Sequence, residues 1–336
     1  MVHLHLLARV LRAFNGAGIP VMPLKGPLLS LELYGDAGIR QSGDLDVLVA
    51  PEQIHDAWKC LHELHWVDEF NNRTLTRRER EFKLRHNHHL AFAHASPGCK
   101  LELHWRAKWE DDVSAAHPLA DSAVSEWQGC SYRTMHPIDL SLDLCNHGAN
   151  HAWRRAKWLG DMARTFALDY VDWQPALEKA RHAGDERSLL LCLRLLKEAY
   201  GLDATRLIDA DAIPPAMMRT VVFALTSPTE PRARIIQGKI IDLVRSNAYK
   251  FWPWPSRSHG DSFAQVAIST ADFNLGRMPN HLFWLYIPLR PFLFVWRHLR
   301  GFHHEQSSTN TRVQVHPGPR RDNAAAPFAQ GAYEAE

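Results

Sequence analysis

The sequence lacks three features, each of which would assign it to a broad class of protein. Its five cysteines include no CxxC pair and no even spacing, so a disulfide framework is not indicated. No uninterrupted run of about 18 apolar residues occurs, which argues against a clean membrane span. Lysine and arginine exceed the acidic residues by only two, 39 against 37, so a uniformly basic surface for long nucleic acid is not indicated either.

The N-terminal stretch also lacks the character of a secretory signal. MVHLHLLARVLRAFNGAG is too polar, and its apolar residues recur at helical spacing. With 46% hydrophobic and 23% charged residues over 336 positions, the composition is that of a soluble globular protein with room for about two domains. We therefore expect a cytoplasmic protein with reduced thiols and no stable membrane span.

Changes in pattern along the chain predict four regions. They are an α+β domain over residues 1–110, a mainly helical domain over 111–245, an aromatic-rich segment over 246–304 and a disordered tail over 305–336. The tail is assigned as disordered because it has no apolar periodicity. Within the aromatic-rich segment, the prolines and arginines that interrupt residues 280–300 favour an interfacial or core position for that run.

Within the first region, helical patterns alternate with short strand-like runs, which predicts a small mixed sheet flanked by helices. Strands are expected at 19–24, 45–49, 89–94 and 101–105, and the last two form a hairpin. Pro27 and Gly35 suit the start and the end of a short helix. From about residue 114 the pattern is helical almost throughout, with its strongest segments at 138–150, 152–169, 174–182 and 187–200.

Two aspartates stand at the mouth of one predicted strand, in the run GDLDV. Side chains two apart on a strand share a face, so Asp44 and Asp46 would hold two carboxylates side by side. A hard cation such as Mg²⁺ between them would offset their repulsion. The alternative is that Asp44 caps a turn and Asp46 is a solvated strand residue.

Three further residues strengthen the first interpretation. Glu102 is an acidic residue in the otherwise apolar second strand of the hairpin, and a third carboxylate is what a two-metal phosphoryl-transfer site requires. Gly26 lies at a strand-to-helix turn where backbone amides can approach a phosphate, and Lys25 beside it can meet that phosphate as a point charge.

At this point the sequence resembles a known family. The run PLKGPLLSLELYGDAGIRQSGDLDVLV is similar to the Lys-Gly, Tyr, Arg, Asp-x-Asp pattern of the uncharacterised nucleotidyltransferase family, within the DNA polymerase β-like nucleotidyltransferase superfamily. KLELHW resembles that family's third-carboxylate strand, and HGANHAWRRAKWLGDMA resembles its helical His-x-x-x-His, Trp and Asp segment. The resemblance covers about residues 1–200.

The resemblance implies a polymerase β-like nucleotidyltransferase domain followed by a helical domain. It further implies transfer of a nucleoside monophosphate, with AMP favoured, from a nucleoside triphosphate to an acceptor, and release of pyrophosphate. Asp44, Asp46 and Glu102 would bind Mg²⁺ (or Mn²⁺) and Glu102 could also act as the base. Lys25, Gly26 and Arg40 would contact the nucleotide, with an exposed loop arginine as the alternative for Arg40.

The superfamily's usual Gly-Ser is here Lys25-Gly26, which leaves open a catalytically weak nucleotide-binding or partner-binding module of the same fold. The aromatic residues of 280–300 leave open, separately, a membrane-surface protein, against which the polar interruptions of that segment count. The acceptor, whether small molecule, saccharide, peptide product or RNA, is not indicated by these residues.

Histidines are numerous, 21 in all, and two positions stand out. His147 and His151 lie four apart on a predicted helix, where a surface facing the site or a packed core pair is favoured over a dedicated metal site. His104 follows Glu102 by two positions and therefore shares its face of the strand. Trp153, Trp158 and their apolar neighbours at helical spacing are expected to pack in the core.

Overall fold

The structure is a computed structural model. It describes residues 2–94, 99–106, 117–151, 153, 155–168, 171–183, 185–202, 218–219, 221–222, 268, 270–274, 278–293 and 295–296. Residues 1–287 form one compact unit and residues 288–336 form a second. The domain boundaries near 110, 245 and 304 stay predictions, and the tail over 305–336 lies outside the described residues.

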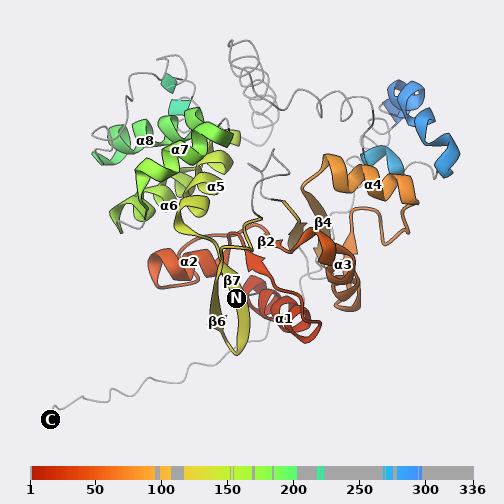
Figure 1. Cartoon of the computed structure of the whole chain (residues 1–336), viewed down its shortest axis with the longest axis horizontal. Coiled ribbons are helices and arrows are strands. Elements are labelled where there is room, and N and C mark those ends of the chain that lie inside the picture. Colours follow the sequence, from red (N-terminus) through yellow and green to blue (C-terminus); the bar gives the residue numbers. More distant parts are fainter. Residues whose placement is uncertain are drawn as a thin grey trace, which may run out of the picture. The chain divides into compact units, whose positions relative to one another are not determined.

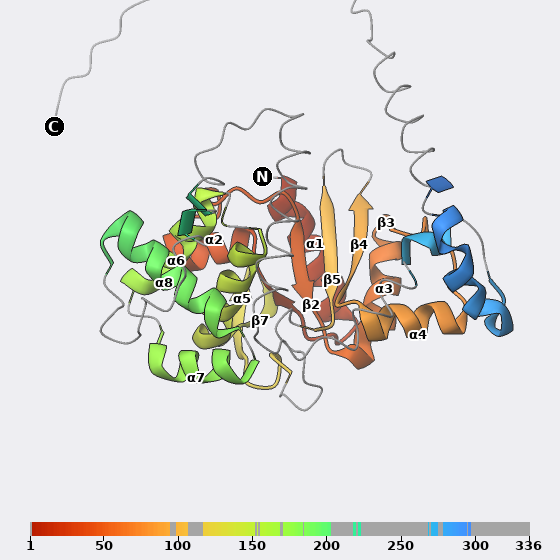
Figure 2. The ribbon, with the colours of Figure 1, turned by 90° about the horizontal axis from the view of Figure 1, so that it is seen from above.

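A five-stranded sheet forms the centre of the N-terminal part. Its strands are β1 (Met22–Pro23), β2 (Leu45–Leu48), β3 (Trp66–Asp68), β4 (His89–His94) and β5 (Lys100–His104). The spatial order is β1-β2-β5-β4-β3, with β2 and β5 parallel and all other neighbours antiparallel. Figure 2 shows these strands side by side with α1 behind them. The α+β class and the small mixed sheet are thereby confirmed, as is the β4–β5 pairing.

The helices around this sheet begin and end at residues with the expected chemistry. They are α1 (Val2–Gly16), α2 (Pro27–Tyr34), α3 (Ile54–Glu63) after a 3₁₀ turn η1 (Pro51–Gln53), and α4 (Arg77–His86). Pro27 occupies the first turn of α2, and Gly35 ends the helix in the left-handed conformation with φ 75°. Gly26, just before α2, also has a positive φ, 84°.

Four helices follow between residues 137 and 200, close to the helical segments predicted from the sequence. They are α5 (Pro137–Asn150), α6 (Ala156–Ala167), α7 (Trp173–Ala183) and α8 (Glu186–Tyr200). Figure 1 shows them as one cluster beside the sheet. Trp153, Trp158 and Met162 are buried in their shared core, so the aromatic and apolar stripe packs in the core as predicted.

One segment departs from the helical pattern predicted after residue 114. Residues 123–134 form a β-hairpin of β6 (Ala123–Trp127) and β7 (Cys130–Thr134). Its turn residues, Gln128 and Gly129, both have positive φ, 51° and 72°, as a two-residue hairpin turn requires. The backbone N–H of Arg133 donates to the carbonyl of Val21, so this hairpin lies against the segment that precedes β1.

Residues 270–287 pack on α4 through two short 3₁₀ helices, η3 (Thr270–Asn274) and η4 (Asn280–Leu285). Phe273 is buried against Phe70 and Phe82 of the sheet domain. Tyr286 is buried as well, whereas η4 contains no buried residue, so this segment reaches the core through these two rings and its other described aromatic side chains are partly or fully exposed. Over the described residues, no helix has both the length and the apolar character needed to cross a membrane.

Candidate active site

The parallel pairing of β2 and β5 brings the predicted carboxylates together. Asp46 lies directly opposite Glu102 in the register, and both share a face with His104. The Nε2 atom of His104 is 3.5 Å from Asp46 Oδ1 and 3.3 Å from Glu102 Oε2. One ligand atom from each of these residues lies within 4.8 Å of the other two, so this donor set fits a divalent cation.

Asp44 lies one residue before β2 begins, and it is exposed. It belongs to none of the groups of three or more potential metal ligands found among the described residues. Partial desolvation and the negative charges of Asp46 and Glu102 nevertheless raise its pKa. The three carboxylates therefore influence one another electrostatically, although Asp44 stands at the edge of the group.

The pKa shifts describe a site in which opposite charges compensate each other. Burial alone would raise the pKa of Asp46, but the contact with His104 and the charge of Lys25 hold that pKa below its usual value. Burial opposes the charged form of His104 too, yet Asp46 and Glu102 raise its pKa. The largely buried Asp46 thus keeps its charge because cationic groups lie beside it.

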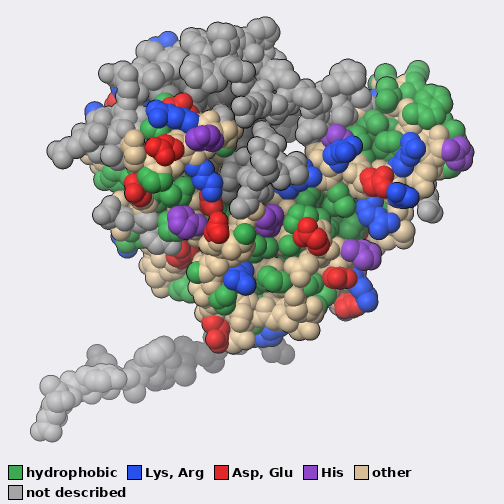
Figure 3. Space-filling model, viewed as in Figure 1, with side chains coloured by type: hydrophobic (Ala, Val, Ile, Leu, Met, Phe, Trp, Pro, Cys, Tyr) green, Lys and Arg blue, Asp and Glu red, His purple; other side chains and the backbone are tan. Residues whose placement is uncertain are grey.

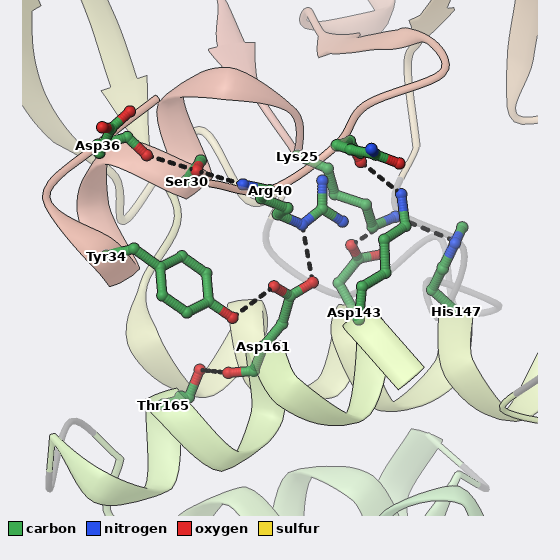
Figure 4. Close-up of polar contacts among 11 residues, drawn as sticks. Lys25, Ser30, Tyr34, Asp36, Arg40, Asp143, His147, Asp161 and Thr165 are labelled. Atoms are coloured by element: carbon green, nitrogen blue, oxygen red, sulfur yellow. Dashed lines mark hydrogen bonds and ion pairs between the residues drawn. The ribbon is translucent and has the colours of Figure 1, made fainter. Parts of the chain in front are cut away.

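Lys25 reaches from the turn before α2 to the helical part of the chain. Its Nζ is 2.8 Å from Asp143 Oδ2 and 3.4 Å from His147 Nδ1, both on α5, as Figure 4 shows. Burial lowers the pKa of Lys25, but Asp143 and then Asp46 more than offset it. The charged form of Lys25 is therefore stabilised by two carboxylates, Asp143 of α5 and the potential metal ligand Asp46.

Arg40 is buried and is not the exposed loop arginine considered as its alternative. Its Nε donates to Asp161 Oδ2 on α6 at 2.7 Å. Tyr34 donates its hydroxyl to the other carboxylate oxygen, and Thr165 donates to the Asp161 backbone carbonyl, so four residues from α2, the following loop and α6 form one network (Figure 4). A role for Arg40 in phosphate binding stays a prediction.

Gly26 stands at the start of α2, as its predicted role requires. No side chain caps this helix, and a Cβ at Gly26 would lie 3.6 Å from Ser42 Oγ. The positive φ of 84° favours glycine at this position. Contact between its backbone and a nucleotide phosphate stays a prediction.

Two charged residues of the helical part, Asp143 and Lys157, were not singled out from the sequence, and Asp161 was noted only as the aspartate of the family-like segment HGANHAWRRAKWLGDMA. Lys157, at the start of α6, donates to the carbonyl of Gln41 at 2.6 Å. Burial, Arg40 and Arg155 lower its pKa, while Asp161 and Asp44 act in the opposite sense. Only the tertiary fold brings these residues to the aspartates. Figure 3 shows acidic, basic and histidine side chains interspersed on this face of the molecule.

His147 and His151 lie together at the end of α5 and pack on Trp158. Their ring centroids are 4.8 Å apart, and the rings of His151 and Trp158 are stacked at 5.1 Å. Neither histidine belongs to a potential metal group within the described residues. The packed arrangement is the one favoured from the sequence over a metal site.

An α+β domain with Asp-x-Asp at one strand and a glutamate on its parallel neighbour has the arrangement expected of a nucleotidyltransferase. Comparison with protein families matches residues 1–201 to the family described as uncharacterised nucleotidyltransferase. The chain belongs to this family, as its sequence resemblance predicts. No curated protein matches the chain.

Two solved structures of the antibiotic-resistance factor ANT(2'')-Ia are similar to part of the chain. Its solution structure shares 13% identity, covering 55% of this chain and 94% of that one, with a TM-score of 0.38. Its crystal structure with adenylyl-2''-tobramycin shares 11% identity, covering 55% and 98%, with a TM-score of 0.38.

Proposed function

We propose that the protein is a nucleotidyltransferase that depends on a divalent cation, Mg²⁺ or Mn²⁺. It transfers a nucleoside monophosphate, with AMP as the favoured group, from a nucleoside triphosphate to an acceptor and releases pyrophosphate. The observation that carries this proposal is the placement of Asp46 opposite Glu102 on parallel strands, with Asp44 beside them.

Each carboxylate has a part in the proposed reaction. Asp44 and Asp46 would hold the cation, and Glu102 would complete the site and accept the proton of the attacking acceptor hydroxyl. The positive charge of the bound cation would stabilise the negative charge on the triphosphate and on the attacking oxygen. Because the pKa of Glu102 is lowered by His104 and His89 against the effect of burial, this carboxylate is ionised at neutral pH and able to take a proton.

Cationic side chains near the aspartates would balance the phosphate charges. Lys157 is only half-buried. The negative charge of Asp44 favours its charged form and so opposes the lowering of its pKa by burial. Lys25 and Arg40 are held in place by Asp143 and Asp161, so they are preorganised and lose little side-chain entropy when an anion arrives. The acceptor class, whether small molecule, saccharide, peptide product or RNA, stays open.

The test is pyrophosphate release from each of the four nucleoside triphosphates, with Mg²⁺ or Mn²⁺ and cell extract as the source of acceptors. We expect release by the wild type and its loss in the Asp44→Ala/Asp46→Ala double variant. Asp56→Asn on α3 changes an exposed aspartate and is the matched control, expected to behave as wild type. Equal release by the double variant and the wild type would refute the proposal.

A catalytically weak nucleotide-binding module is the second candidate. The engagement of both Lys25 and Arg40 with carboxylates of the helical part favours it, because a triphosphate would have to compete with these partners. Under this alternative, the folded wild type binds a nucleoside triphosphate in equilibrium dialysis but releases no pyrophosphate with any extract.

A further inference from the structure

We propose that His104 is a ligand of the divalent cation, so that this centre binds Mn²⁺ in preference to Mg²⁺. The proposal deepens the proposed function by naming its cation, and it rests on that function only in assigning the cation a catalytic use. Three carboxylates alone would give an all-oxygen site of the kind that Mg²⁺ occupies. An imidazole among them changes the preference of the site.

The two donor–donor distances from His104 match those around a single bound ion, and all three donor atoms lie within 4.8 Å of one another. The Nε2 atom of His104 is 3.5 Å from Asp46 Oδ1 and 3.3 Å from Glu102 Oε2. Ligands about 2.0–2.2 Å from a common ion stand roughly 3.0–3.5 Å from each other in octahedral or tetrahedral geometry. An ion can therefore enter between these atoms with little movement of the side chains.

The local hydrogen bonding points the same way. His104 is 9% exposed, and its Nε2 is buried without a hydrogen bond of acceptable angle within the described part of the chain. The nearest polar atoms are Asp46 Oδ1 and Glu102 Oε2, at 3.5 and 3.3 Å. Burying an unpaired polar atom is costly, and an ion that takes the place of the Nε2 proton, which is released to solvent, would contact all three groups.

A second imidazole lies at the same place. His89 is the cross-strand partner of His104, and its Nε2 is 4.0 Å from Glu102 Oε2. His88, His89 and His104 also form a group whose ligand atoms lie within 4.8 Å of one another. Imidazole nitrogen suits transition-metal ions, whereas Mg²⁺ takes oxygen ligands almost entirely. A site with two carboxylates and one or two imidazoles therefore favours Mn²⁺ within the proposed pair of ions.

The first experiment uses the wild-type chain loaded with less than one equivalent of Mn²⁺. Electron spin-echo envelope modulation detects nitrogen nuclei bound to Mn²⁺. We expect modulation from a coordinated imidazole nitrogen, and its loss in the His104→Gln variant. A wild-type spectrum without nitrogen modulation would overturn the proposal, and would leave His104 as a counter-ion for the two carboxylates.

The second experiment measures selectivity. Mn²⁺ dissociation constants come from the free-ion signal in paramagnetic resonance, and Mg²⁺ constants come from competition. We expect His104→Gln to weaken Mn²⁺ binding by about tenfold or more, as loss of a metal-site partner does, and to weaken Mg²⁺ binding less. A purely structural role would lower both affinities equally, and that result would contradict the proposal.

Two controls keep these measurements interpretable. His55→Gln removes an exposed histidine on α3, and we expect it to leave both constants unchanged. If His104→Gln does not fold by circular dichroism, the His88→Gln/His89→Gln variant decides the proposal: nitrogen modulation that persists there comes from His104, and its loss there would overturn the proposal. Coordinated nitrogen in a protein that releases no pyrophosphate would uphold the metal site and refute the proposed function. Pyrophosphate release without coordinated nitrogen would support the proposed function and refute His104 as a metal ligand.

Discussion

Two buried ion pairs hold the proposed site between the sheet and the helical part of the chain. Lys25 pairs with Asp143, and Arg40 pairs with Asp161. In both pairs the cation comes from the segment around α2 and the carboxylate from α5 or α6. A buried charge is tolerated only with its partner, so the loss of one member leaves the other uncompensated.

Asp161→Asn is therefore expected to destabilise the protein. The side chains of Arg40 and Asp161 are only 4% and 1% exposed, so the unpaired guanidinium should cost about 3–5 kcal/mol of the free energy of unfolding. Urea denaturation followed by circular dichroism measures this cost. The exposed Asp121 provides the control Asp121→Asn, with no expected change, and a midpoint for Asp161→Asn equal to wild type would argue against the assigned role of the pair.

Gly148→Ala tests the close packing at the end of α5. A Cβ at Gly148 would clash with the ring of Trp153, so overpacking should cost about 1–3 kcal/mol. Gly160→Ala on α6 is the matched control, because its nearest neighbours are 3.9 Å away and alanine is favoured over glycine in a helix by roughly 0.5–1 kcal/mol. The two substitutions should thus move the melting temperature in opposite directions, and shifts of the same sign would refute the account.

At the scale of elements, local patterns predicted much of the fold. The helical period is present in the sequence of α5–α8, and Pro27 and Gly35 mark the two ends of α2. The hairpin β6–β7 was wrongly predicted as helix. Its strands show little alternation of buried and exposed side chains, and Gln128-Gly129 is a weak turn signal.

For the site, the sequence places Asp44, Asp46 and Glu102 on two strands, but it carries no information on their contacts across the fold. Asp161 lies 121 residues from Arg40, and Asp143 lies 118 residues from Lys25. Such pairs depend on tertiary packing, which no local spacing specifies. The charge partners of Lys25 and Arg40 therefore became visible only in the structure.

The start of α4 gives a prediction at this scale. The Thr76 hydroxyl oxygen accepts a hydrogen bond from the backbone N–H of Glu79, and the Glu79 carboxylate accepts one from the backbone N–H of Thr76. Together they form a complete capping box. Thr76→Ala should lower the free energy of unfolding by about 0.5–2 kcal/mol. Thr74→Ala, at an exposed position two residues earlier, should change it little, and equal effects of the two variants in urea denaturation would contradict the assigned cap.

For the whole molecule, the question is how far the cooperative unit extends beyond the family-matched region, residues 1–201. Residues 270–287 lie outside that region but pack on α4. Tyr286 donates its hydroxyl to the buried Glu79 at 2.9 Å, and the Arg73 side chain donates to the carbonyl of Phe273 at 2.7 Å. These contacts join the later segment to the sheet domain through its core.

Phe273→Ala should therefore destabilise the whole of this unit and not the later segment alone. Phe273 is 1% exposed, and truncation of a buried phenylalanine costs about 3–5 kcal/mol. Circular dichroism and tryptophan fluorescence should report one coincident transition at a lower urea concentration. Trp284→Ala removes a larger ring that is 57% exposed, so it should change the midpoint little. An early, separate transition in Phe273→Ala, with the main transition unmoved, would show that residues 270–287 unfold independently of the nucleotidyltransferase region.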